Sequence, residues 1–245
     1  MESNDDNALP SFRVLPDTCT ELFINYRQPA LATIPGKIES NKEESFAVFR
    51  LSQYMDVQMH PRTGCIAICF QPGVAHHFFS LPMSEVSNRV IAIEHLWKNE
   101  TRQLEDQIAL AKTNEERVNI LQDFLLNQLH VHNKDSEKRI AYCLWQINLS
   151  KGQLSVTDMA RQVNLGERQL TRYFNNCLGL SPKEYTNVSR FVHSLDHLKK
   201  YPTISLTEVA YDSGYYDQSH FIHDYQKYTG FAPGELLSLN NILFC

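Results

Sequence analysis

The chain has 245 residues, of which 42% are hydrophobic and 21% are charged, a composition typical of a globular protein with a buried core. No stretch approaches the roughly 18 uncharged apolar residues that a membrane-spanning helix needs. The first twenty residues lack the basic and apolar regions of a signal peptide. We therefore expect a cytoplasmic protein of one large domain or two ordinary ones, with no membrane partner.

The net charge of −5 is unevenly distributed. Residues 1–135 hold 12 Lys and Arg against 18 Asp and Glu, whereas residues 136–245 hold 11 against 10. The acidity therefore belongs to the N-terminal half. The C-terminal half is only weakly basic, so charge alone does not predict a nucleic-acid partner.

The six cysteines form no CxxC pair, and their spacing predicts neither a disulfide framework nor a zinc site. Cys65 and Cys69 would share one face of a strand, where they could simply be packed side chains. We expect no metal and no cofactor.

The N-terminal half predicts a small, largely antiparallel β domain with helices. Short apolar runs at residues 21–26, 45–51 and 64–70 are separated by turns rich in Pro and Gly. Thr113 and Glu116 then form a capping box. Apolar residues behind it recur at helical spacing and predict an amphipathic helix; they are Val118, Leu121, Leu125 and Leu129.

The polar segment 130–138 is the best domain boundary, and beyond it the pattern is helical throughout. It divides the chain into an N-terminal domain of residues 1–133 and an all-α domain of residues 134–245. The fold class expected from these patterns is α+β.

The C-terminal half contains an internal repeat, with one copy from Ser155 to Pro182 and the other from Ser205 to Pro233. Two copies indicate duplication of one supersecondary unit rather than a solenoid. One residue is inserted in the second copy. The matching pairs are Ser155 and Ser205, Asp158 and Glu208, Ala160 and Ala210, Leu170 and Phe221, Phe174 and Tyr225, Gly179 and Gly230, and Pro182 and Pro233.

Each copy predicts a helix-turn-helix unit. The leading serines cap a first helix, Asn164 and Gly214 occupy the turn, and Gly179 and Gly230 end the second helix. A helix of about 18 residues within 182–200 would form a strut of roughly 27 Å between the units. Such a strut could place the two second helices about 34 Å apart, in successive major grooves of one duplex.

The second helices leave polar side chains outward that can contact base edges and phosphates. In the first copy these are Arg168, Thr171 and Arg172, and in the second they are Gln218, Ser219 and Ile222 or His223. Caps and periodicity alone would equally fit two packed helical hairpins that never touch DNA. The chemistry of the outward side chains favours double-stranded DNA as the partner.

The segment 204–233 resembles the signature of the AraC/XylS family of bacterial transcription regulators. It carries A-x-x-x-G-[YF]-x-D-Q-S-H-F followed by Y-x-x-x-x-G-x-x-P, and the resemblance extends over residues 136–237. It implies a sequence-specific DNA-binding regulator that contacts promoter DNA and RNA polymerase and is not an enzyme.

The resemblance also implies which side chains face DNA. They are Arg168, Thr171 and Arg172 from the first unit, and Gln218, Ser219 and His223 from the second. Family members often carry arginine at position 223 and phenylalanine at position 225. We therefore expect a weaker DNA contact from His223 and a core position for Tyr225.

Residues 15–26 and 70–96 more loosely resemble a sensor-like domain of uncertain role found upstream of the same module. The resemblance implies a small-molecule effector, a homodimer, or both, and the helix near 114–130 is a candidate dimer seam. A run of aromatic and histidine residues could line a pocket or an interface, or could simply be core: Phe70, His76, His77, Phe78 and Phe79.

Two other functions are open from the residues alone. The first is an enzyme with a metal site at His60, His76 and His77. Adjacent histidines on a strand would point to opposite faces, which disfavours one shared ion. No Ser-His-Asp order, phosphate-binding loop or HExxH motif supports an enzyme either. The second is a protein-interaction module that never touches DNA.

Overall fold

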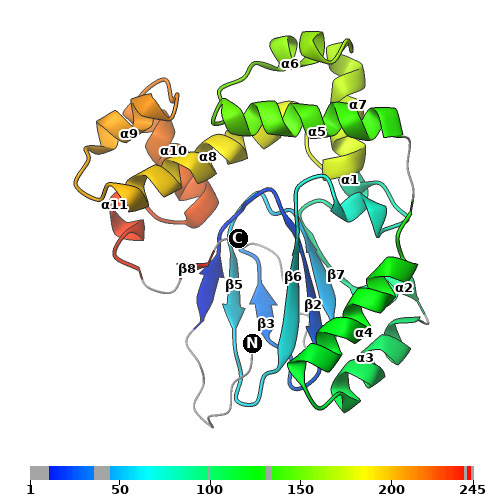
Figure 1. Ribbon diagram of the computed structural model, residues 1–245. Helices are drawn as coiled ribbons and strands as arrows, with labels where there is room; N and C mark the ends of the chain where they lie inside the picture. Colours follow the sequence, from blue (N-terminus) through cyan, green and yellow to red (C-terminus); the bar gives the residue numbers. More distant parts are fainter. Residues whose placement is uncertain (1–10, 36–44, 99, 131–133, 240–241, 244–245) are drawn as a thin grey trace.

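A computed structural model describes residues 11–35, 45–98, 100–130, 134–239 and 242–243. Strands fill the N-terminal part and helices dominate afterwards (Figure 1). The three predicted strand regions are confirmed in β2, β4 and β6. The N-terminal strands are β1 (Phe12–Val14), β2 (Thr20–Asn25), β3 (Leu31–Thr33), β4 (Phe46–Phe49), β5 (Met55–Gln58), β6 (Cys65–Phe70) and β7 (Arg89–Ala92).

The strands form two four-stranded sheets, ordered β3-β5-β1-β8 and β6-β2-β4-β7. Neighbouring strands are antiparallel, except that β8 (Ile242–Leu243) pairs parallel to β1. One apolar core joins side chains of both sheets, with Phe23, Phe46 and Val48 from one and Met55 and Val57 from the other. The sheets therefore pack face to face, as in a sandwich.

The other face of the β6-β2-β4-β7 sheet is covered by helices. Leu22, Ile24 and Phe49 of the sheet share a core with Trp97 and Leu121. The predicted capping box at Thr113 and Glu116 is confirmed. The elements on this side are η1 (Ala75–His77), α1 (Met83–Val86), α2 (Ile93–Trp97), α3 (Glu100–Leu110) and α4 (Asn114–Asn127).

The rest of the chain is helical apart from β8. We call α6 and α7 the first unit, α9 and α10 the second unit, and α8 the linker helix; Figure 1 shows α8 running between the two units. Their bounds are α5 (Lys134–Leu149), α6 (Val156–Gln162), α7 (Glu167–Leu178), α8 (Pro182–Lys200), α9 (Leu206–Asp212), α10 (Gln218–Thr229) and α11 (Pro233–Leu236).

The α+β class is confirmed, with antiparallel sheets and helices first and a helical region after them. The boundary between residues 133 and 134 stays a prediction, because residues 131–133 lie outside the described part of the chain. Within that part, every helix is too short or too polar to cross a membrane.

Candidate nucleic-acid interface

Both units have the caps and turns that the repeat predicts. The Ser155 hydroxyl accepts a hydrogen bond from the Asp158 backbone N–H at 3.1 Å. The Ser205 hydroxyl accepts one from the Glu208 backbone N–H, also at 3.1 Å. In the turns, Asn164 and Gly214 have φ of 53° and 75°. At the ends of α7 and α10, Gly179 and Gly230 adopt the left-handed conformation of helix C-caps.

Large apolar side chains hold α7 and α10 against the rest of each unit. Phe174 and its counterpart Tyr225 are fully buried. The Tyr225 hydroxyl lies 3.0 Å from the hydroxyl of Ser194 on the linker helix, so its polar atom is hydrogen-bonded inside the core. The expectation of a core position for Tyr225 is therefore confirmed, and Ser194 explains how a tyrosine fits there.

A further pair of equivalent contacts links the two helices of each unit. The Thr157 hydroxyl donates to the Glu167 carboxylate at 2.6 Å, and the Thr207 hydroxyl donates to the Gln218 side-chain oxygen at 3.1 Å. This pair of contacts was not predicted from the sequence. The sequence feature that could have indicated it is a threonine two residues after each capping serine. The contact ties the first residue of α7 or α10 to the helix before it.

The side chains predicted to face DNA lie on the outer surfaces of α7 and α10. Arg168, Arg172, Ser219 and His223 are exposed, and Thr171 and Gln218 are half-buried. Thr171 donates its hydroxyl to a carbonyl of its own helix at 2.8 Å. None of the six is buried, so the surface needed for DNA contact is present on both units.

The second unit has an exposed aromatic beside this surface that was not predicted from the sequence. Tyr216 is 85% exposed and precedes Asp217, whose side chain caps α10 by accepting from the His220 N–H at 2.7 Å. The signature motif leaves position 216 unspecified, so the motif does not indicate a role for this residue. An exposed ring at the start of α10 can pack against sugar and base edges.

The C-terminal ends of α7 and α10 both contact the N-terminal sheets and helices. A Cβ atom on Gly179 would lie 2.8 Å from the carbonyl oxygen of Met83 in α1. Near Gly230, the Arg13 guanidinium donates to the Thr229 carbonyl at 2.9 Å and lies 3.6 Å from the centre of the Tyr54 ring. A cation there also complements the negative end of the α10 dipole.

The linker helix also interacts electrostatically with the N-terminal part of the chain. Burial lowers the pKa of Arg50 to about 10, while Glu184 of α8 opposes that shift. Burial raises the pKa of Glu184, but hydrogen bonds from Ser181 and the charge of Arg50 outweigh it and leave that pKa below its ordinary value. Arg50, which follows β4, and Glu184 on α8 therefore favour each other's charged forms.

The three histidines of the enzyme alternative are arranged differently from the expectation. His76 and His77 lie in the 3-10 turn η1 rather than on a strand, and their ring centres are 4.1 Å apart. The expectation that they point to opposite faces was wrong, because a 3-10 turn does not alternate side chains as a strand does. Their ligand atoms lie within 4.8 Å of one another and of a carboxylate oxygen of Glu137; the described groups of this kind do not include His60.

Two tandem helix-turn-helix units joined by one helix define the C-terminal region as a DNA-binding domain. Residues 159–238 match a family described as a helix-turn-helix domain, and residues 1–92 match a domain of unknown function, DUF6597. Its C-terminal region is thus similar to the helix-turn-helix regions of AraC-type transcription regulators.

Similar proteins include two bacterial regulators. The HTH-type transcriptional regulator GbdR of Pseudomonas aeruginosa is 32% identical over 90 residues, which are 37% of this chain and 24% of that protein. The HTH-type transcriptional activator RhaS of Salmonella arizonae is 31% identical over 78 residues, 32% of this chain and 28% of that protein. The chain thus spans less than a third of the length of either.

A solved structure resembles the whole fold. ToxT of Vibrio cholerae superposes with a TM-score of 0.50 at 14% sequence identity, covering 96% of this chain and 95% of that one. The likeness extends over both the sheets and the helical region.

Proposed function

We propose that the protein is a sequence-specific DNA-binding transcription regulator whose N-terminal domain controls the C-terminal module. The duplication carries the proposal, because each copy holds exposed polar side chains on a helix braced in the same way. In this proposal α7 and α10 enter successive major grooves of promoter DNA. It acts in the cytoplasm and contacts RNA polymerase from the bound site.

Six side chains carry recognition in this proposal. Arg168 and Arg172 contact guanines or phosphates, because arginine donates bidentate hydrogen bonds to both. The other four contribute shorter polar contacts: Thr171, Gln218, Ser219 and His223. Tyr216 adds an apolar contact beside them. With few cations, the second unit gains more of its affinity from shape and neutral hydrogen bonds than the first.

Genome-wide mapping of sites bound by the tagged protein tests the proposal. We expect an extended, non-palindromic sequence with two conserved segments one helical turn apart, located near promoters. On a purified duplex, binding should weaken steeply with salt, since phosphate contacts release counterions. Absence of preferred genomic sites, together with no detectable binding to a duplex at low salt, would contradict the proposal and favour a protein-interaction module.

We also propose that the N-terminal domain forms a homodimer through α4 and the neighbouring edge strand β6. An apolar groove of about 480 Å³ lies between them, lined by side chains that include Ile68 and Leu125. Val118 and Leu126 also line this groove and are 51% and 60% exposed, an exposure of apolar surface that marks an interaction site.

The double variant Val118→Glu and Leu126→Glu is expected to be monomeric. A dimer formed through α4 and β6 would bury the new glutamates of both protomers against one another without positively charged partners. Sedimentation equilibrium of the variant and the unchanged protein measures this. Leu110→Glu is the matched control, since Leu110 is 82% exposed on α3 outside the groove. A monomeric unchanged protein, or a dimer in the double variant, would refute the seam.

A further inference from the structure

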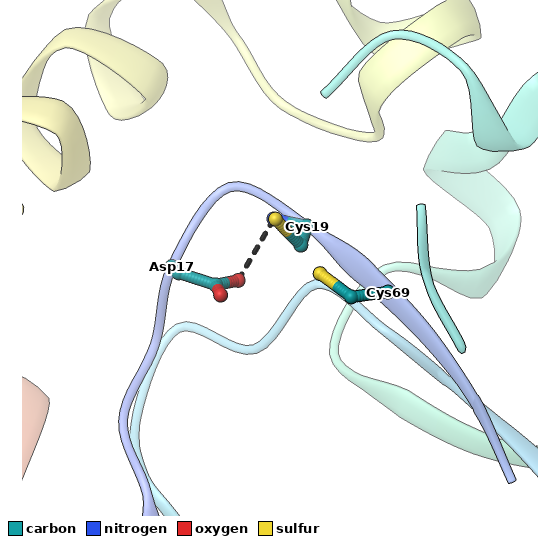
Figure 2. Close-up of side chains that lie close together, drawn as sticks. All are labelled: Asp17, Cys19 and Cys69. Atoms are coloured by element: carbon teal, nitrogen blue, oxygen red, sulfur yellow. Dashed lines mark hydrogen bonds between the residues drawn. The ribbon is translucent and has the colours of Figure 1, made fainter. Parts of the chain in front are cut away.

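Two cysteines and an aspartate come together where the β6-β2-β4-β7 sheet faces the helical region. Asp17 and Cys19 precede β2, and Cys69 is near the end of β6 (Figure 2). One carboxylate oxygen and the two sulfurs all lie within 4.8 Å of one another. In the register, Glu21 pairs with Cys69, so Cys19 comes two residues earlier on the same face.

The donor set suits a thiophilic divalent ion. Zn²⁺ binds cysteine sulfur and aspartate oxygen in tetrahedral sites, whereas Mg²⁺ and Ca²⁺ prefer oxygen alone. The Cys19 backbone N–H donates to one Asp17 oxygen at 2.8 Å, which orients the carboxylate, as second-shell contacts do in metal sites. Asp17 and Cys19 are half-buried and Cys69 is exposed, so an ion can enter and keep a water as fourth ligand.

The cluster adjoins the linker helix. Asp17 and Cys19 line a cavity of about 410 Å³ together with Trp145 of α5 and His193 of α8. Between the two ligands, the side chain of Thr18 is hydrogen-bonded to Tyr185 of α8.

Tyr185 links this segment to the first unit. Its ring packs edge-on against Phe174 of α7 with centroids 6.0 Å apart. A displacement of residues 17–19 can therefore be transmitted to α7 through Tyr185 of the linker helix.

We propose that Asp17, Cys19 and Cys69 bind one thiophilic divalent metal ion, and that the bound ion fixes residues 17–19 against the linker helix. On binding, each thiol releases its proton to solvent and each sulfur donates an electron pair to the metal. A metal ion is then the effector of the N-terminal domain; this regulatory part rests on the proposed function.

Titration of the full-length reduced protein with Co²⁺ and Zn²⁺ tests the site. We expect one tightly bound ion, a Co²⁺–thiolate charge-transfer band in the near ultraviolet, and proton release. Cys19→Ser and Cys69→Ser should abolish the band, and Asp17→Asn should weaken affinity by about 10–100-fold or more. Trp145 fluorescence should change with the ion in the unchanged protein.

Two variants are controls. Cys177→Ser removes a thiol from α7, outside the cluster, and His77→Gln disrupts the other ligand group; both should keep the ion and its band. Unchanged affinity in the two cysteine variants would overturn the site. A Cys19–Cys69 disulfide in oxidised protein, combined with no zinc binding by reduced protein, would also overturn it.

Duplex binding with and without Zn²⁺ tests the regulatory part. Zn²⁺ should change the DNA affinity of the unchanged protein about fivefold or more and leave the Cys19→Ser variant unaffected. Zinc binding without any effect on DNA affinity would overturn only the regulatory part. If the unchanged protein also fails to bind DNA, with or without Zn²⁺, the proposed function is refuted, whatever the result of the metal titration.

Discussion

Replacing Arg168 and Arg172 with alanine is expected to weaken operator binding by about 1–3 kcal/mol for each arginine that contacts a base. Both side chains are exposed on α7. Arg172 should also set the preferred base at one position of its half-site, so Arg172→Ala should relax selectivity there. Titrating labelled operator and operators with single base changes measures both effects.

The matched control is Arg102→Ala. Arg102 is also exposed, but it lies on α3, which is separated from both units by the sheets and α2 in Figure 1. It removes the same charge and therefore reproduces any general electrostatic loss. If the two kinds of variant weakened binding equally, the assigned face of α7 would be wrong, even with DNA binding itself intact.

Phe174→Ala is expected to lower the free energy of unfolding of the helical region by about 3–5 kcal/mol. The ring is fully buried, in one core with Leu170 and Tyr185. Truncation removes its burial and leaves a cavity that the surrounding helices fill only in part. Because the ring also positions α7, DNA binding should fall under conditions where the variant remains folded.

Urea denaturation followed by tryptophan fluorescence measures this loss, since Trp145, one of the two tryptophans, lies on α5, next to the first unit. Leu149→Ala is the control, because Leu149 on the same helix is 65% exposed and its loss should change stability by about 0.5 kcal/mol or less. An equal effect of the two substitutions would show that Phe174 does not support the core of the unit.

The helical half of the fold could be predicted closely because its determinants are local. Capping serines, the positive φ at Asn164 and Gly214 and the C-cap glycines each act within a few residues of chain. Because the unit is duplicated, each of these signals occurs twice in the sequence. The outward position of Arg168 and Arg172 followed from the same helical period that buries Phe174.

The contacts between the two halves could not be predicted, because they depend on residues far apart in the chain. Nothing near Arg13 indicates that it donates to the carbonyl of Thr229, 216 residues later. The approach of Cys19 to Cys69 likewise depends on which strands are neighbours. The error over His76 and His77 came from assigning a strand where the chain forms a 3-10 turn.

The pairing of β8 with β1 ties the end of the helical region to the N-terminal sandwich. Arg13 and Val14 are aligned with Ile242 and Leu243, and the same Arg13 also donates to the carbonyl of Thr229 at the end of α10. One short strand of the sandwich, β1, is therefore attached both to the C-terminal strand and to the second unit. A change that shifts β1 acts on α10 directly, without passing through the linker helix.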